Sequence, residues 1–194
     1  MVYPIIYPIK NQYIIFKQNN ILFLKMTEFK DRLMWDAEHG QILDADRRYL
    51  MLRADVLMGL FRRLEEPARG QALRALGEAV MEQGGQSARA YWEACGRRPQ
   101  ALLASIVNIS AQLGWGAWRI EHLHDAGLRV QVRNSPFAKG FGAHDEPLCR
   151  PIVGMLTAVG ALIYDREVRV QERHCCAQGS HADCLFTVTP RANE

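Results

Sequence analysis

The residues best suited to carry chemistry lie in the last quarter of the chain. Four of its five cysteines fall there: Cys149, Cys175, Cys176 and Cys184. Cys175 and Cys184 sit at the two feet of a short predicted turn, which can bring two sulfurs onto one ion. An odd number of clustered cysteines does not fit a disulfide scaffold. The pattern favours reduced thiols, a local metal site and a cytoplasmic setting.

The type of ligand indicates which metal this would be. Zn²⁺ prefers thiolate and imidazole ligands in a closed tetrahedron. Cys149 is a candidate third ligand, because it lies near the start of a predicted helix, where the helix dipole favours thiolate over thiol. The alternative interpretation is that these cysteines are small buried residues of a hairpin.

Hydrophobic periodicity predicts the elements that must position these cysteines. Helices are expected over residues 53–64, 71–81, 86–94, 99–113 and 149–164. Two-residue alternation predicts strands over residues 118–122 and 128–132, one that starts at 168, and one over 185–188. Antiparallel hairpins with segregated helices indicate the α+β class, with helices packed on an antiparallel sheet.

Three local expectations follow from the same patterns. The Gly84-Gly85 pair predicts a helix break, and residues 134–147 are expected to form a loop. The first helix is expected to bury one apolar face, made of Val56, Leu57, Leu60, Phe61 and Leu64.

The cysteine-rich stretch resembles the C-terminal signature of the 4-vinyl-reductase domain family. The matching residues are Glu172, Cys175, Ala177, Gly179, Cys184 and Phe186. Pro147-Leu148-Cys149, followed by a glycine-containing amphipathic helix, resembles the segment upstream in that family. Residues 40–53 resemble the start of the sensor domains of phenol- and xylene-responsive activators.

The resemblance implies a fold shared with haem-nitric-oxide sensors and Golgi-tethering subunits, in which helices and an antiparallel sheet enclose an apolar pocket. Such domains often form dimers, and the aromatic sensors hold zinc with three Cys and one Glu. Cys149, Cys175 and Cys184 match the three Cys positions. The loop after Gly179 is one residue longer than usual, so Cys176 could replace Cys175.

The fourth zinc ligand is where this chain departs from the aromatic sensors. Their Glu ligand aligns with Val130, which cannot bind metal. The fourth ligand is therefore expected from one of five residues: Cys176, His174, His181, His144 or Glu146.

A candidate ligand pocket is predicted from aromatic side chains that cluster in the segments lining the family's pocket. These are Trp92, Trp115, Trp118, Phe137 and Phe141. A mainly apolar cavity with few polar groups suits a small aromatic or hydrophobic ligand. The phenol-contacting His and Trp of the sensors align near Ser110 and Val132, so phenol specificity is not expected to carry over. The alternative is that these aromatic residues only pack the core.

Charge excludes other classes of function. The 194 residues include 24 Lys and Arg and 21 Asp and Glu, a net charge of +3. Residues 1–26 contain three Lys and no acid, so residues 27–194 balance at zero. That balance gives no case for nucleic-acid binding. No run of apolar residues is long enough for a membrane span.

Residues 1–26 differ in composition from the rest of the chain. They contain six Ile and no Ala, Gly or Arg, whereas residues 27–194 contain 19 Arg and two Lys. We expect them to be a non-native or disordered extension, with residues 27–194 forming a single ligand-binding domain.

These features together predict a stand-alone, zinc-containing bacterial sensor domain that binds a small hydrophobic or aromatic molecule as a cytoplasmic homodimer. A second hypothesis is a (bacterio)chlorophyll 4-vinyl-reductase-like protein or tetrapyrrole carrier. A third is a scaffold or tethering subunit. Catalysis is not expected, because the chain has neither a dinucleotide-binding loop nor a nucleophile elbow.

Overall fold

The computed structural model describes residues 6–9, 12–17, 20–24 and 28–192. The chain divides into two compact units, residues 1–51 and residues 52–194. The expected domain boundary after residue 26 and the expected extension before it stay predictions, and part of residues 1–26 lies outside the described residues.

The first unit contains short antiparallel strands and one helical turn. Its elements are β1 (Ile6–Ile9), β2 (Gln12–Lys17), β3 (Asn20–Leu24), α1 (Phe29–Arg32), β4 (Met34–Asp36), β5 (Gln41–Asp44) and β6 (Arg47–Tyr49). Strands β1, β2 and β3 form one sheet, and β4, β5 and β6 form another. The buried Phe29 ring meets Tyr49 edge-on at 5.4 Å, and Arg32 pairs with Asp44 at 3.2 Å.

The second unit is built on a four-stranded antiparallel sheet. Its strands are β7 (Ala117–His124), β8 (Gly127–Arg133), β9 (Val168–His174) and β10 (Cys184–Pro190), in the order β7-β8-β10-β9. Alternate residues of β8 are buried, among them Val130 and Val132, whereas Arg129 and Arg133 are exposed. The two predicted hairpins and the α+β class are confirmed.

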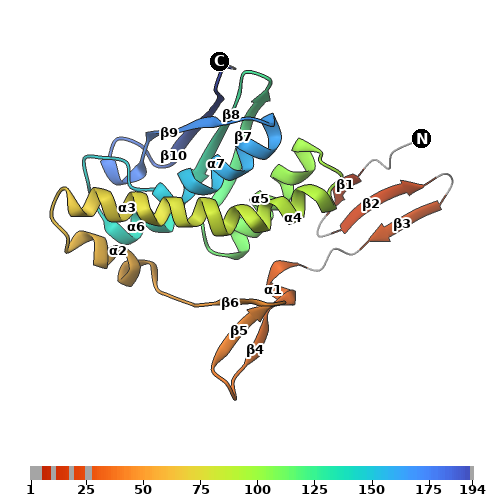
Figure 1. Cartoon of the computed structure of the whole chain (residues 1–194), viewed down its shortest axis with the longest axis horizontal. Coiled ribbons are helices and arrows are strands. Elements are labelled where there is room, and N and C mark those ends of the chain that lie inside the picture. The colour runs from red at the N-terminus through yellow and green to blue at the C-terminus, as the bar shows by residue number, and fades with distance from the viewer. Residues whose placement is uncertain (1–5, 10–11, 18–19, 25–27, 193–194) are drawn as a thin grey trace. The chain divides into compact units, whose positions relative to one another are not determined.

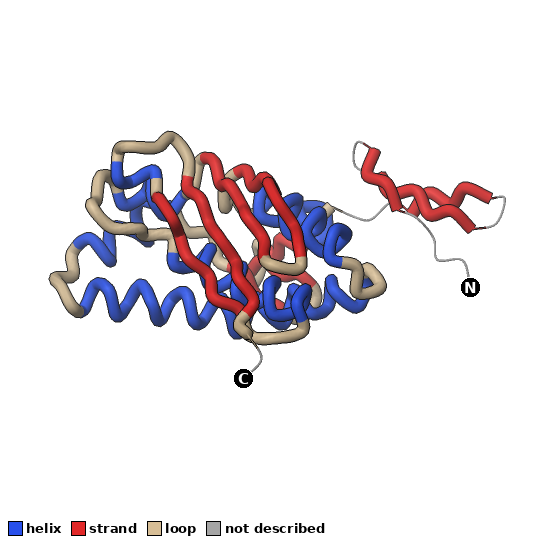
Figure 2. The backbone as a smooth tube through the Cα atoms, turned by 90° about the horizontal axis from the view of Figure 1, so that it is seen from above, coloured by secondary structure: helices blue, strands red, loops and turns tan. Residues whose placement is uncertain are grey.

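Helices cover one face of this sheet in two layers. They are α2 (Ala54–Arg62), α3 (Ala68–Ala79), α4 (Gly85–Ala94), α5 (Pro99–Gln112), α6 (Pro136–Phe141) and α7 (Arg150–Tyr164). Helix α7 lies on β9 and β10, and α3 and α4 pack on α7 (Figures 1 and 2). Among the described residues, no helix is both long and apolar enough to cross a membrane.

Glycines let the helical layers approach closely. A Cβ on Gly154 of α7 would lie 2.0 Å from the backbone oxygen of Gly77 in α3. A Cβ on Gly160 would lie 2.7 Å from the Val188 side chain of the sheet. The position of α7 between α3 and the sheet therefore depends on side chains that are absent.

The expected break at Gly84-Gly85 is wrong. A π-helical turn over Val80–Gly84 joins α3 to α4, and Gly84 and Gly85 both keep right-handed helical angles. A Cβ on Gly84 would lie 2.8 Å from the Met155 methyl group, and one on Gly85 would lie 3.2 Å from Ala158. The pair serves close packing against α7, and π-helical turns are the usual way to fit an extra residue into a helix.

Two further expectations need correction. The predicted loop over residues 134–147 contains α6, which Ser135 caps and which has Pro136 in its first turn, a typical helix start. Helix α2 buries Met58 and Phe61, but it leaves Val56 and Leu60 more than half exposed. The apolar stripe of α2 is thus wider than the face that the unit can cover.

We predict that Gly154→Ala lowers the free energy of unfolding by about 2–3 kcal/mol, because the new methyl group forces α7 away from α3. Gly70→Ala is the matched control, since its Cβ would meet only the ends of the flexible Glu66 and Arg74 side chains. That variant should be neutral or more stable by up to about 1 kcal/mol. Urea denaturation measures both, and equal stability of the two variants would contradict the packing argument.

Candidate metal centre

Four potential metal ligands come together where α7 meets the β9–β10 hairpin. Cys149 is the residue that precedes the first turn of α7, and Glu172 lies on β9. Cys175 follows the end of β9, and Cys184 begins β10. One ligand atom from each of these residues lies within 4.8 Å of those from the other three.

An irregularity in β9 explains how Glu172 and Cys175 can face the same side. Phe186 pairs with Glu172, but the next residue of β10, Leu185, pairs with His174. Arg173 is thus an extra residue, as in a β-bulge. In a regular strand, residues three apart point to opposite faces. The bulge restores the same face and brings Cys175 opposite Cys184.

The three sulfurs form a nearly equilateral triangle. The Sγ atom of Cys149 lies 3.8 Å from that of Cys175 and 3.7 Å from that of Cys184, and the third side is 3.7 Å. All three side chains are fully buried. Free cysteines with these separations are not bonded to each other, and their sulfurs all face a common centre with the Glu172 carboxylate.

Hydrogen bonds hold this arrangement from outside. The Ser135 hydroxyl lies 3.1 Å from Cys149 Sγ, and the backbone N–H of Cys176 donates to Cys184 Sγ at 3.3 Å. The backbone N–H of Cys149 donates to Glu172 Oε2 at 2.9 Å. The other carboxylate oxygen, Oε1, is buried without a hydrogen-bond partner. A buried orphan oxygen is costly, and a cation would satisfy it.

The electrostatics of the cluster also favour a cation. Burial, and then the charge on Cys175, raises the pKa of Glu172 to about 8. Hydrogen bonds to Cys175 and Cys184, together with burial, raise the pKa of Cys149, whereas hydrogen bonds from Cys149 and Cys184 lower that of Cys175. Four acidic groups thus share a buried space where like charges repel, and a bound cation would allow them to ionise together.

The structure brings together the three expected cysteines and corrects the fourth partner. Glu172 occupies the place expected of Cys176, His174, His181, His144 or Glu146. Cys176 Sγ lies 3.7 Å from Cys184 Sγ but outside the four-atom group. The rings of His174 and His181 stack on each other at 3.7 Å, and His144 bonds to the backbone of Glu146.

Glu172 was missed because its role depends on the bulge. It was recognised as part of the Glu-x-x-Cys signature, but in a regular strand it would point away from Cys175. The available signal was its position in the alternation of Val168, Val170 and Glu172, which places an acid on the buried face of the sheet. Val130 and Glu172 lie on either side of Phe186, because both pair with it. The carboxylate therefore reaches the cluster from the opposite neighbouring strand.

Most of the expected ligand-pocket residues gather beside this centre. The rings of Trp115 and Phe137 meet edge-on at 5.2 Å, and the Trp118 indole donates to the Trp115 backbone oxygen at 3.0 Å. The Trp115 N–H donates to the Ser110 backbone oxygen at 2.8 Å, and Trp118 pairs with Val132. We call Ser110, Trp115, Trp118, Val132 and Phe137 the aromatic cluster. Four of its side chains are at most 5% exposed, and Trp115 is half-buried.

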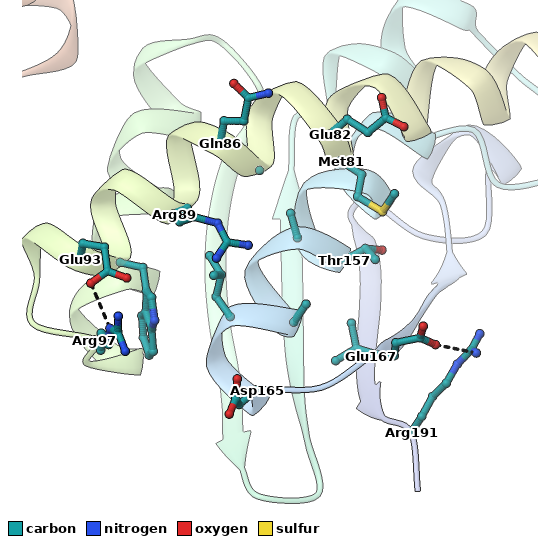
Figure 3. Close-up of a pocket in the computed structure, with 16 residues that line it drawn as sticks. Met81, Glu82, Gln86, Arg89, Glu93, Arg97, Thr157, Asp165, Glu167 and Arg191 are labelled. Carbon is teal, nitrogen blue, oxygen red and sulfur yellow. Dashed lines mark hydrogen bonds and ion pairs between the residues drawn. The ribbon is translucent and has the colours of Figure 1, made fainter. Parts of the chain in front are cut away.

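The other two expected pocket residues lie apart from this cluster. Phe141, at the end of α6, packs against His144 with ring centroids 5.0 Å apart. Trp92 lines a separate groove of about 770 Å³ between α4 and α7, shown in Figure 3. The sequence therefore placed seven residues in one pocket, whereas the structure distributes them over three places.

The sequence of the sheet and α7 identifies the domain. Residues 128–190 match the vinyl-4-reductase domain. This chain contains a vinyl-4-reductase domain. The match runs from β8 to the end of β10 and includes all four residues of the candidate metal centre, so the expected resemblance to this family is confirmed. Among curated proteins, none matches the sequence.

Solved structures of similar proteins were also found for this vinyl-4-reductase domain protein. The phenol-responsive sensory domain of the transcription activator PoxR, with phenol, shares the fold: the TM-score is 0.70 at 16% identity, with 83% of this chain and 86% of that one covered. A vinyl-4-reductase family protein from Methanocaldococcus jannaschii has a TM-score of 0.46 at 18% identity, with 72% and 91% covered. A trafficking protein particle complex subunit 3 from Naegleria fowleri has 0.48 at 12%, with 72% and 95% covered.

We predict one bound metal ion per chain, lost on substitution of any of four ligands. Changing Cys149, Cys175 or Cys184 to Ser, or Glu172 to Gln, should weaken metal binding by more than about 100-fold, since even outer partners of a metal contribute about 10–100-fold. Cys176→Ser should keep the metal. Inductively coupled plasma mass spectrometry of each purified variant measures this.

Cys95→Ser is the control for the loss of a thiol elsewhere, because Cys95 bonds only to the backbone of Trp92 and Arg98. If Cys176→Ser lost the metal and Cys175→Ser kept it, the site would move by one residue along the chain. Metal-free protein from a careful purification would contradict the site itself.

Metal affinity should fall as the pH drops below about 8. Glu172 and Cys149 have raised pKa values, so each carries a proton in the metal-free protein that must leave when the metal binds. Each released proton weakens apparent affinity by about tenfold per pH unit of acidification. Competition titration with a chelator at several pH values measures the slope. Glu172→Gln should have a slope smaller by about one proton, and equal slopes would contradict the assignment.

Proposed function

We propose that this protein is a zinc-containing sensor domain that binds a small hydrophobic or aromatic molecule. The observation that carries the proposal is the buried set of three thiols and one carboxyl inside the stretch that matches the vinyl-4-reductase domain. The residues fit zinc well. A zinc–sulfur bond of about 2.3 Å gives sulfur separations of about 3.8 Å in a tetrahedron, and the three observed separations are 3.7–3.8 Å.

Zinc bound here would be structural. Cys149, Cys175, Cys184 and Glu172 would fill all four positions of a tetrahedron, and catalytic zinc sites keep one position open. The ion would tie the start of α7 to β9 and β10, and through Ser135 to α6. It would also stabilise a region where four acidic groups are buried together.

The aromatic cluster is the proposed site of ligand response. Val132 pairs with Cys184 on one side and with Trp118 on the other, so one strand joins the cluster to the metal centre. A second connection runs through α6, since Ser135 contacts Cys149 and Phe137 contacts Trp115. A ligand that moves these side chains would therefore act on the zinc-bound hairpin.

Support for this class of ligand comes from the PoxR sensory domain, which was solved with phenol and shares the fold. Ser110 and Val132 replace the polar phenol contacts expected from the resemblance, so we propose a less polar ligand than phenol. The three buried thiols also suit the reducing conditions of the cytoplasm, where we propose the protein resides.

Binding should be measurable as stabilisation. Small neutral aromatic and aliphatic compounds at about 100 times their Kd should add about 2.7 kcal/mol to the free energy of unfolding. Thermal denaturation of zinc-loaded protein screens them, and Phe137→Leu should weaken the effect of those that bind, whereas Leu113→Ala at an exposed site should not. If no compound stabilises folded, zinc-loaded protein, the scaffold hypothesis would be preferred.

We further propose that the domain forms a homodimer through α2. Leu52, Val56 and Leu60 are spaced by four residues and are 51%, 53% and 57% exposed, which leaves an apolar stripe on one side of the helix. Such stripes are typical of protein interfaces.

Analytical ultracentrifugation should show a dimer that Leu60→Arg dissociates. Leu113→Arg, at an exposed leucine far along the chain, is the matched control and should leave the dimer intact. A wild-type protein that sediments as a monomer at micromolar concentration would contradict the proposal.

A tetrapyrrole carrier is the second candidate function, favoured by the width of the groove between α4 and α7. A bound tetrapyrrole would show a shifted absorption band on titration with protoporphyrin. A spectrum equal to that of free protoporphyrin would remove this candidate.

A further inference from the structure

The groove between α4 and α7 combines an apolar floor with charged walls. Its floor is made of small residues, Gly85, Ala158 and Ala161, and Trp92 lines it from α4. At about 770 Å³ it falls within the range of about 300–1,000 Å³ typical of small-molecule sites. The aromatic cluster does not contribute to its lining, so the groove is a separate site.

Most of the charges of the groove are already neutralised. Arg97 pairs with Glu93 at 3.0 Å on α4, and Arg191 pairs with Glu167 at 2.9 Å beside the sheet. Figure 3 shows these two ion pairs at opposite sides of the groove. They leave the cation of the middle of the groove as the group to be explained.

That cation is Arg89. Its guanidinium points from α4 into the space facing α7 (Figure 3), and within residues 28–192 it has no hydrogen bond or ion pair. Trp92 lies one helical turn further along α4, on the same side. A planar donor group beside an aromatic surface and a floor of small residues can bind a carboxylate whose body is apolar.

We propose that this groove binds an apolar monocarboxylate, with its carboxylate on Arg89 and its body between Trp92 and the floor of α7. The two remaining acids, Glu82 and Asp165, lie at opposite ends of the groove with Arg89 between them (Figure 3). They would repel a second negative charge on the ligand, so the groove selects against phosphates and dicarboxylates. Thr157 and Gln86, which also line the groove, offer polar neighbours for the head group.

The test compares charged and neutral ligands of the same shape on the full chain. Isothermal titration calorimetry with naphthoate, and separately with naphthalenemethanol, measures the contribution of the carboxylate. Arg89→Gln should weaken naphthoate binding by about tenfold, as loss of one charge-assisted contact does. The same substitution should leave naphthalenemethanol binding unchanged. Decanoate in place of naphthoate tells whether the groove prefers a flat or a chain-like body.

Two variants complete the test. Arg74→Gln removes an exposed arginine of α3 that does not line the groove, and it should leave naphthoate binding unchanged. Ala161→Leu fills the floor and should weaken binding of both naphthalene compounds, with circular dichroism to confirm folding. Amide chemical shifts should change at Gly85, Ala158 and Ala161 on binding.

Three results would overturn the proposal: no binding of either carboxylate, equal naphthoate affinity in the wild type and Arg89→Gln, or shift changes at Trp115 and Phe137 instead. The last result would assign the ligand to the aromatic cluster. Binding of neutral compounds at that cluster is measured separately, so either site can fail without the other.

Discussion

Three buried sulfurs and one buried carboxyl meet where the first turn of α7 crosses the hairpin of β9 and β10. Burial of these acidic groups is costly unless they are paired, and the raised pKa of Glu172 is the direct sign of that cost. The surrounding hydrogen bonds reduce the cost only in part, because Glu172 Oε1 is left without a partner among the described residues. A cation at the centre of the group would satisfy the remaining demand and fix α7, β9 and β10 relative to each other.

The helical layers depend on a different constraint, which is the absence of side chains. Gly154 approaches Gly77, and Gly160 approaches the sheet, so that α7 fits between two neighbours. These contacts bring the start of α7 to the hairpin, and Cys149 can then reach Cys175 and Cys184. The metal centre and the glycine contacts therefore act on the same helix, one at its end and the other along its length.

The aromatic cluster and the groove present two different environments for ligands. The cluster is packed around Trp118 and Phe137 and connects to the metal centre through Val132 and Ser135. The groove is open, and its Arg89 has no ionic partner in the part of the chain that the structure describes. A sensor could use the first for its response and the second for a charged apolar compound, because α7 borders both regions.

The sequence alone determined the α+β class, the two hairpins and three of the four groups of the metal centre. These features are local: alternation along β8 and helical periodicity along α7 follow from which side chains must be buried. The Cys149, Cys175 and Cys184 set came from residue type and family resemblance, which need no coordinates.

Tertiary structure decided what depends on contacts between distant residues. Glu172 faces the sulfurs because Arg173 is an extra residue in β9, and the need for that bulge arises only when β9 pairs with β10. Gly84-Gly85 stays helical because α7 packs against it, although glycine pairs by themselves favour a break. Trp92 left the expected pocket for the groove because the direction of α4 relative to α7 is set by that packing, which no periodicity in the sequence records.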